Sequence, residues 1–281
     1  MSMSDSIVLD IRDLKSHFFT AKGEIPAVDG VSIEVPAGKI IGIVGESGCG
    51  KSMTAMSVMG LLRHPGRIVG GSITLDGRDI THLSARELAK VRGDEISMIF
   101  QEPMTSLNPV YPVGKQVQEA ILLHQKVSKE EAKQRVLDIF RAVGIPEPEK
   151  RYKSYPHQLS GGLRQRVMIG MAMVCRPKVM IADEPTTAID SITQYEILEE
   201  FVRIKKEHDT AMIFITHDLG AISKVADDLV VMNSGKIADR GSFSHILHHA
   251  SDPYTRLLVE KRSAVMKKYR ESIGHENGGA A

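Results

Sequence analysis

The feature of this sequence that most constrains its fold is a short apolar run that leads directly into a glycine-rich turn. The run IIGIV is followed by Gly45 to Ser52, which read GESGCGKS and fit the pattern GxxxxGK[ST]. A wholly apolar, β-branched run is typical of a strand buried on both faces, as in a parallel sheet covered by helices. Lys51 to Leu62 is predicted to be a helix. The order strand, glycine-rich loop and helix therefore predicts an α/β fold with a phosphate-binding loop.

The residue types of this loop predict its chemistry. Glycines let successive backbone amides face inward around a phosphate, and the following helix adds its positive N-terminal end. Lys51 is expected to reach the β- and γ-phosphate oxygens of a nucleotide, and the Ser52 hydroxyl is expected to bind Mg²⁺. The alternative is a glycine-rich turn that contains a lysine by chance. The predicted nucleotide-binding residues of this segment are Gly45, Glu46, Ser47, Gly48, Cys49, Gly50, Lys51, Ser52 and Met53.

Two carboxylates form the second half of the predicted site. The apolar run Val179 to Ala182 is predicted to be a strand, and Asp183 and Glu184 follow it directly. Ligands of open α/β sheets bind at the carboxyl ends of the strands. Asp183 is expected to hold the Mg²⁺ shell, and Glu184 is expected to face the attacking water as general base. Two acidic residues at an exposed strand end are the alternative.

The rest of the chain fits a mostly parallel sheet with helices on its faces. Ile7 to Val35 contains the β-like stretches IVLDI and VSIEV around the turn-rich TAKGEIPAVDG, which predicts an antiparallel flap. Between Pro103 and Gln165 the strand signals disappear and helices are expected, among them Lys129 to Val143, so this region is predicted to be an inserted helical subdomain. Further strands are expected at Gly71 to Leu75, Ile96 to Phe100, Ala211 to Thr216 and Leu229 to Met232.

Composition argues against several classes of protein. The 281 residues carry 36 Lys and Arg against 35 Asp and Glu, and a net charge of +1 disfavours a general nucleic-acid binder. The only cysteines, Cys49 and Cys175, have no disulfide-framework or zinc-ribbon spacing, so a reducing compartment is expected. The apolar runs are far shorter than the ~20 residues that a membrane-spanning helix needs. The start of the chain does not resemble a secretory signal, which favours the cytoplasm.

Beyond the phosphate loop and the Asp183–Glu184 strand, several motifs resemble those of ATP-binding-cassette ATPases, and they stand in that family's order. Leu159 to Gln165 read LSGGLRQ and resemble the signature motif, while Gln101 fits the Q-loop. Ala188 to Asp190 fits the D-loop, and His217 in ITHD resembles the switch histidine. The resemblance covers about Ile7 to Leu258.

This resemblance implies a fold and further site residues. The implied fold is a P-loop NTPase core with a mostly parallel sheet, an N-terminal antiparallel β subdomain and the helical subdomain at about 103–165. It implies one ATPase cassette over residues 7–258 and a C-terminal tail over 259–281. Gln101 is implied to bind both ATP and Mg²⁺ and to take part in catalysis with Lys51, Glu184 and His217. Asp190 is implied to act in the D-loop.

The signature can also be interpreted chemically. Ser160, Gly161 and Gly162 precede a predicted helix from Leu163 to Cys175, so they form a helix N-terminus with free backbone amides. In the family two cassettes pair head to tail, and each signature completes the partner's ATP site. The resemblance therefore implies that Ser160, Gly161, Gly162 and Gln165 act on the partner's nucleotide. An N-capped helix start is the alternative, and both interpretations can hold together.

Two further site residues are predicted, and for each of them ordinary packing is the competing interpretation. His217 closes an apolar strand whose end joins the same sheet edge as Glu184, so we favour a role at the γ-phosphate or the attacking water over a satisfied core or surface histidine. Phe18 lies ahead of the phosphate loop and resembles the aromatic residue of the family that stacks on adenine. Phe19 competes for this role, and core packing is the alternative for both.

Three segments resemble the ATPases of the peptide/nickel (dipeptide and oligopeptide) importer family. They read QEPMTSLNPVYPVG, YPHQLSGG and DPYTRLL. This resemblance implies uptake of di- or oligopeptides through integral-membrane permease subunits, with a solute-binding protein as an indirect partner. It implies a second ATPase subunit, either a paralogue or a second copy, and a peripheral position on the cytoplasmic face of the inner membrane. No nucleic acid is implied as a partner.

One departure from that family keeps a second cargo open. Peptide-type members often continue past PYTRLL into a cysteine-rich stretch, whereas no cysteine follows Cys175 here. Nickel or metal-chelate uptake is therefore the alternative. His245, His248 and His249 are interpreted as residues of a polar helix rather than a metal site, and KRSAVMKKYR as a solvated face rather than a lipid-binding patch.

Other classes of protein that use a phosphate loop are disfavoured. DNA-repair and chromosome-organising cassettes insert a long coiled coil before the signature, but no heptads fill that interval here. Translation-factor relatives carry two cassettes on one chain. A small-molecule kinase would need neither the signature glycines nor Glu184.

Overall fold

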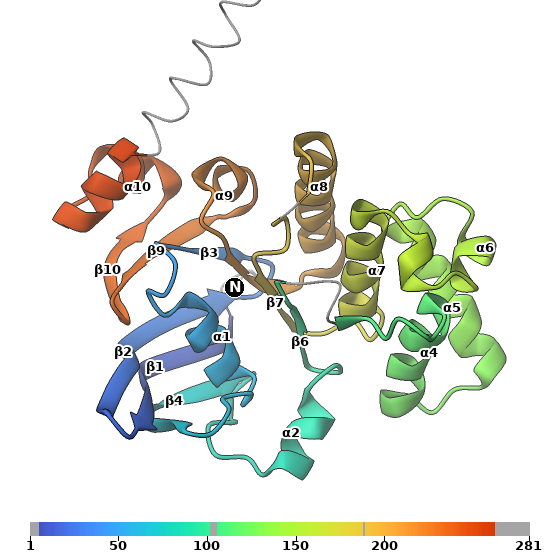
Figure 1. Cartoon of the computed structure of the whole chain (residues 1–281), viewed down its shortest axis with the longest axis horizontal. Helices are drawn as coiled ribbons and strands as arrows, with labels where there is room; N and C mark the ends of the chain where they lie inside the picture. Colours follow the sequence, from blue (N-terminus) through green and yellow to red (C-terminus); the bar gives the residue numbers. More distant parts are fainter. Residues whose placement is uncertain (1–5, 102–105, 188, 262–281) are drawn as a thin grey trace, which may run out of the picture.

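The computed structural model describes residues 6–101, 106–187 and 189–261. A central sheet of six strands has the order β10-β9-β3-β8-β7-β6 (Figure 1). Neighbouring strands from β9 to β6 run parallel, and only β10 is antiparallel to its neighbour. The strands are β3 (Ile40–Val44), β6 (Ile96–Ile99), β7 (Val179–Asp183), β8 (Ala211–Ile215), β9 (Asp228–Asn233) and β10 (Lys236–Gly241). The predicted mostly parallel sheet is confirmed.

Alternate residues of the central strands enter two different hydrophobic clusters. Ile40 and Val44 of β3 belong to the cluster on the side of the helices, while Ile41 and Ile43 belong to the cluster on the side of the second sheet. Successive side chains of a strand point to opposite faces, so a strand covered on both sides needs apolar residues throughout. Every residue of β3, β7 and β8 is buried, which explains why these strands are apolar apart from Asp183 at the end of β7.

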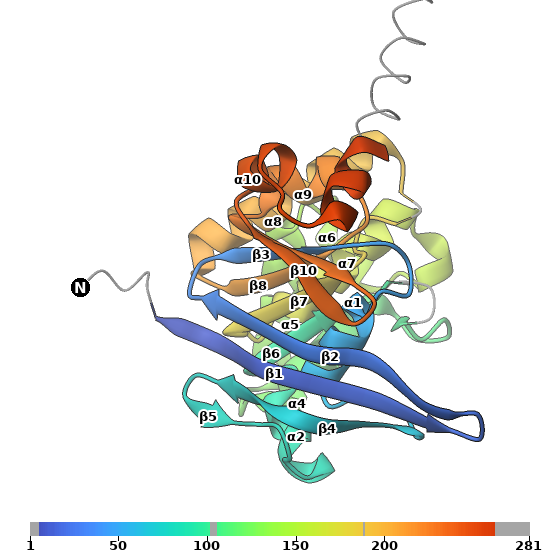
Figure 2. The same cartoon turned by 90° about the vertical axis from the view of Figure 1, so that its left-hand side faces the viewer.

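An antiparallel sheet of four strands lies beside the core, in the order β2-β1-β4-β5 (Figure 2). It contains β1 (Ile7–Thr20), β2 (Gly23–Pro36), β4 (Gly66–Leu75) and β5 (Arg78–Asp79). The predicted flap is present, but its strands are longer than the sequence suggested. The segment TAKGEIPAVDG was expected to be turn-rich, whereas all but its first three residues belong to β2. Pro26 is tolerated there because β2 is an edge strand.

The helices gather on the two sides of the central sheet. The phosphate loop leads into α1 (Lys51–Val58), which ends before the predicted Leu62 because Gly60 takes a left-handed φ of 58°. Helices α4, α5 and α6 cluster with α7 at the end of the molecule away from the antiparallel sheet (Figure 1). The helices are α2 (Ala85–Val91), α4 (Val113–His124), α5 (Lys129–Ala142), α6 (Pro148–Tyr152), α7 (Gly161–Met173), α8 (Ser191–His208), α9 (Leu219–Val225) and α10 (Phe243–His248), with a 3-10 turn at Pro156–Gln158.

The predicted tail begins inside an ordered helix. Residues 253–261 are helical, and Leu258 and Val259 are both buried. The boundary placed after Leu258 therefore interrupts a helix that packs on the core. Residues 262–281, which include most of the basic run KRSAVMKKYR, lie outside the described residues.

Candidate nucleotide site

The loop between β3 and α1 requires glycine at two positions for steric reasons. A Cβ at Gly45 would lie 2.4 Å from the Met232 carbonyl oxygen, and one at Gly50 would lie 2.6 Å from that of Ala27. Both glycines also have positive φ angles, 157° at Gly45 and 108° at Gly50. The loop therefore packs closely against β9 and β2. Its other side faces the carboxyl ends of the central strands, where Glu184 and His217 lie.

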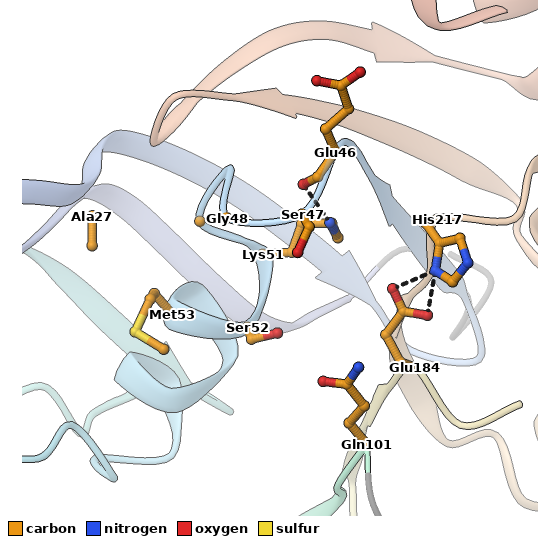
Figure 3. Close-up of a pocket in the computed structure, with 11 residues that line it drawn as sticks. Ala27, Glu46, Ser47, Gly48, Lys51, Ser52, Met53, Gln101, Glu184 and His217 are labelled. Atoms are coloured by element: carbon orange, nitrogen blue, oxygen red, sulfur yellow. Dashed lines mark hydrogen bonds and ion pairs between the residues drawn. The ribbon is translucent and has the colours of Figure 1, made fainter. Parts of the chain in front are cut away.

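A pocket of about 460 Å³ opens at this edge (Figure 3). It brings together the phosphate loop, the Q-loop glutamine, Glu184 and His217, as the sequence predicted. Ala27 also lines it and was not expected, because only the fold brings the Ala27 carbonyl of β2 against Gly50 of the loop. The lining residues are Ala27, Glu46, Ser47, Gly48, Gly50, Lys51, Ser52, Met53, Gln101, Glu184 and His217.

Lys51 holds its ammonium group inside the loop. Its Nζ donates hydrogen bonds to the carbonyl oxygens of Gly45 at 2.8 Å and Glu46 at 2.9 Å. The side chain is buried, so its charge is compensated by backbone carbonyls rather than by a carboxylate. A cation in that position is a donor available to a phosphate.

Ser52 and Asp183 face each other across the site. The Ser52 hydroxyl donates a hydrogen bond to Asp183 Oδ1 at 3.0 Å. Burial raises the pKa of the Asp183 carboxyl above its usual value, and the bond from Ser52 partly opposes this shift. A hydroxyl and a carboxylate oxygen side by side are hard ligands of the kind that Mg²⁺ prefers.

Glu184 is held in one orientation by three contacts. Its backbone has a left-handed φ of 50°, and its amide donates to the Ile215 carbonyl at 2.9 Å. Thr187 Oγ1 donates to Glu184 Oε2 at 3.0 Å, and His217 Nδ1 lies 2.9 Å from Oε1 and 2.8 Å from Oε2. Figure 3 shows the imidazole and the carboxylate turned toward each other at the pocket wall. This is the arrangement of a carboxylate base oriented by a histidine.

The comparisons with known proteins agree with this geometry. A family profile described as "ABC transporter" matches residues 28–187, more than half of the chain. The chain belongs to the ABC transporter family. The oligopeptide transport ATP-binding protein OppD of Bacillus subtilis is 48% identical over 270 residues, which cover 96% of this chain and 74% of that protein. The dipeptide transport ATP-binding protein DppD of Escherichia coli is 44% identical over 252 residues, or 90% of this chain and 77% of that protein.

Solved structures show the same cassette fold. The cbiO1 protein of Clostridium perfringens, part of the ABC transporter complex cbiONQ, superimposes with a TM-score of 0.75 at 26% identity. The match covers 96% of this chain and 98% of that one. A bacterial ABC transporter cassette solved as a dimer gives a TM-score of 0.75 at 24% identity, covering 84% of this chain and 98% of that one. The present chain is thus an ATP-binding cassette ATPase.

The signature of this ABC cassette does not line the pocket. Ser160 caps α7, and its hydroxyl accepts a hydrogen bond from the Leu163 amide at 3.3 Å. Gly161 faces open space, whereas a Cβ at Gly162 would lie 2.5 Å from Thr193 Cγ2 on α8. Ser160 and Gly161 are exposed, so their polar groups are accessible to a second molecule. The capped helix start, one of the two interpretations of the signature, is confirmed.

Gln165 does not fit its predicted role. Its side chain is only 1% exposed, on the inner face of α7, and its Nε2 has no hydrogen-bond partner within the described part of the chain. A side chain in that position cannot reach a nucleotide held by another molecule. The phase of the helix turns Gln165 inward and leaves Ser160 and Gly161 outside.

Asp190 of the predicted D-loop begins α8. Its carboxylate accepts a hydrogen bond from the Thr193 amide at 3.0 Å, and that bond holds the pKa of Asp190 below its usual value. Ile189 packs against the main hydrophobic cluster. Ala188, the first residue of the motif, lies outside the described residues.

Neither predicted adenine-stacking residue lines the pocket. The ring of Phe18 covers Gly66 on β4, where an added Cβ would lie 2.7 Å from Phe18 Cε1. Phe19 stacks with the Arg67 guanidinium, whose Cζ lies 4.2 Å from the ring centroid. Both rings therefore contact residues of β4 in the antiparallel sheet. Core packing, the alternative for both, is not seen either: Phe19 is 36% exposed, and neither ring belongs to a hydrophobic cluster of the described residues.

Two features are absent from the described residues. No helix in residues 6–101, 106–187 and 189–261 is long and apolar enough to cross a membrane. In the same ranges no group of three or more His, Cys, Asp and Glu could hold a metal ion. The ring centroids of His245 and His248 lie 6.2 Å and 6.4 Å from that of His249.

Proposed function

We propose that this chain is the ATP-hydrolysing subunit of an importer that takes up di- or oligopeptides through a separate permease. The observation that carries the proposal is the pocket lined by the P-loop lysine, by Ser52 and by the His217–Glu184 pair, with Asp183 hydrogen-bonded to Ser52 behind its wall. The cargo is inferred from relatives that are 44–48% identical and are named dipeptide or oligopeptide transport ATP-binding proteins.

The catalytic roles follow from the contacts in the pocket. The loop amides and Lys51 would bind the β- and γ-phosphates, and Lys51 would leave the two carbonyls that now accept its hydrogen bonds. Ser52 and Asp183 would hold Mg²⁺, and the bound ion would neutralise negative charge on the phosphates. Gln101 lines the same pocket and would complete this side of the site.

Hydrolysis needs a base that accepts a proton from water. Glu184 Oε1 and Oε2 are oriented by His217 and Thr187, so the carboxylate is held while one side remains open to the pocket. Phosphoryl transfer depends on alignment and charge stabilisation more than on covalent chemistry. The chain therefore contributes a fixed base, a cation and the loop amides.

The signature would act on a second cassette. Among the residues described, none of Ser160, Gly161 and Gly162 lines the pocket that contains the P-loop. A bare helix N-terminus favours a phosphate, and α7 has 13 residues. We therefore propose a head-to-tail pair, with a paralogue or a second copy as the other subunit, closed by ATP and released by hydrolysis.

The permease would dock next to the Q-loop. Val110, which is 79% exposed, and Tyr111 lie between the Q-loop and α4, and Tyr111 lines the same groove as Leu123, which is 74% exposed near the end of α4. Burial of such a patch stabilises a complex. This partner would place the chain on the cytoplasmic face of the cell membrane, and a solute-binding protein would select the cargo.

The test is to purify the full chain from its own cells and to identify the integral-membrane chains that accompany it. The purified complex is then placed in vesicles, and uptake of labelled dipeptide, tetrapeptide and nickel chelate is measured with ATP. Peptide uptake that Lys51→Ala abolishes is the expected result. Uptake of nickel chelate alone would favour the alternative cargo, and the absence of any membrane partner would contradict a transport role.

A further inference from the structure

The last described helix reaches back to the phosphate loop. The backbone amide of Glu46 donates a hydrogen bond of 2.9 Å to the phenol oxygen of Tyr254, which lies 208 positions later in the chain. Tyr254 belongs to the segment DPYTRLL, which the site described above does not use. We propose that Tyr254 is a positioning residue that holds the P-loop ready for nucleotide. This proposal rests on the proposed function, because it concerns ATP binding at the same loop.

The exposed half of the loop has few other anchors. Gly235 fixes the buried half, since its amide donates to the Cys49 carbonyl at 2.9 Å. Residues 46–48 are exposed. In the part of the chain that the structure describes, Tyr254 is the one group from outside the loop that bonds to the backbone of these three residues. Loss of this bond would free the side of the loop that faces the phosphates.

The anchor acts on the residue that also supports the loop lysine. The Glu46 carbonyl accepts a hydrogen bond from Lys51 Nζ at 2.9 Å, while the amide of the same residue is bound to Tyr254. Nucleotide must draw Lys51 away from that carbonyl. A fixed amide keeps the loop in place when the lysine leaves, so the amides remain oriented toward the phosphate.

Tyr254 is itself firmly placed. Asp252 Oδ1 accepts the Tyr254 amide at 2.8 Å, and Asp239 Oδ2 on β10 accepts the Ser251 amide at 2.8 Å. Thr255 is fully buried, and the Tyr254 ring packs against the main hydrophobic cluster. Burial also raises the pKa of the Tyr254 phenol above its usual value. The phenol oxygen is thus a fixed point of the core rather than part of a loose tail.

The same helix provides a matched control. Lys261 Nζ lies 3.4 Å from Glu46 Oε1, but both side chains are more than half exposed. Such a pair contributes little in water. Lys261→Gln therefore removes a contact between the same helix and the same loop residue without touching the loop backbone.

The experiment compares Tyr254→Phe and Lys261→Gln with the wild-type full chain. Phenylalanine keeps the ring and its packing, and water can reach the Glu46 amide, so the variant is expected to fold. Binding of a non-hydrolysable ATP analogue with Mg²⁺ is measured by calorimetry. Loss of one hydrogen bond should lower the fraction of molecules whose loop is ready to bind nucleotide by about twofold to tenfold. Tyr254→Phe should therefore bind the ATP analogue about twofold to tenfold more weakly than the wild type. Lys261→Gln should bind as the wild type does.

A second readout separates positioning from general stability. Hydrogen exchange should become faster in peptides that contain Glu46 and stay unchanged in the strands β7 and β8. Binding by Tyr254→Phe within twofold of the wild type would overturn the inference, as would faster exchange spread evenly over the core. Failure of the wild type to bind nucleotide at all would instead refute the proposed function.

Discussion

Two adjacent glycines of the signature should respond in opposite ways to the same substitution. Alanine at Gly161 meets no heavy atom within 4 Å, whereas alanine at Gly162 would place its Cβ 2.5 Å from Thr193 Cγ2. Gly161 is the first residue of α7, where alanine is the better helix former. The two variants therefore separate what the signature does for the folded chain from what it does for a partner.

The structure sets the size of each effect. Gly161→Ala should leave the free energy of unfolding unchanged or raise it by up to about 1 kcal/mol, because it removes backbone freedom from the unfolded chain. Gly162→Ala should lower it by about 1–3 kcal/mol, as overpacking does. At about 2–4 °C per kcal/mol for domains of roughly this size, scanning calorimetry of the nucleotide-free chain resolves the two.

The effects of the two variants on ATP hydrolysis should not follow their effects on stability. A methyl group at Gly161 projects from the exposed helix start and would hold a γ-phosphate away from the α7 amides. Loss of such donors typically costs about 10²-fold or more in turnover. Gly161→Ala should therefore lose hydrolysis in the paired state while it keeps full stability and ATP affinity.

The clash expected from Gly162→Ala can be relieved by a second substitution, at Thr193. Thr193→Ser removes the methyl group that the new Cβ would meet, and the backbone bond to Asp190 remains. The double variant should recover most of the lost stability. Wild-type hydrolysis by Gly161→Ala would refute the role of the signature in trans, and a loss of more than about 1 kcal/mol in that variant would refute the steric reasoning.

Three further substitutions test the pocket itself. Glu184→Gln should lower turnover by at least ~10²-fold, as expected for loss of a general base, and leave ATP binding intact; steady phosphate release would contradict the assignment. Thr187→Val removes the hydrogen bond to Glu184 Oε2, so kcat should fall by about threefold to tenfold at constant KM, and an equal rise in KM would argue against a positioning role. Asp183→Asn should raise the Tm of the nucleotide-free chain at pH 7. Burial raises the pKa of Asp183, so ionisation of this carboxyl reduces stability as the pH rises through that pKa. The gain from asparagine should be complete above that pKa and should shrink as the pH falls through it toward the usual value of an aspartate. An equal gain at every pH would show that the charge is not the cause.

The parts of the fold that the sequence predicted well are those set by local patterns. The strand before the P-loop and the strand before Asp183 are apolar throughout, and burial on both faces requires such runs. The length of the β1–β2 hairpin was missed, because Pro26, Asp29 and Gly30 have low strand propensity. Pairing with β1 overrides that propensity over the whole segment.

The site residues that the sequence missed or placed differently from the structure depend on contacts between distant segments. Phe18 was expected at adenine, but its partner Gly66 is set by the pairing of β1 with β4. Gln165 lies in α7, whose sequence shows no clear apolar face. Only the packing of this helix in the fold turns the Gln165 side chain inward. No sequence pattern predicts a role for Thr187 in the site. Only the turn after Glu184 brings the Thr187 hydroxyl to the Glu184 carboxylate.

The outer surface around the signature supports a partner at this face. Gly162 packs on Thr193, so the starts of α7 and α8 form one rigid unit. Ile192 and Tyr195 extend from this unit, and Ile192 is 77% exposed. The large apolar side chain of Ile192 therefore follows the start of α8, to which the signature is attached through Gly162, while Gly161 beside it stays exposed. Apolar area next to free backbone donors fits a surface that is buried when a phosphate held by a second cassette arrives.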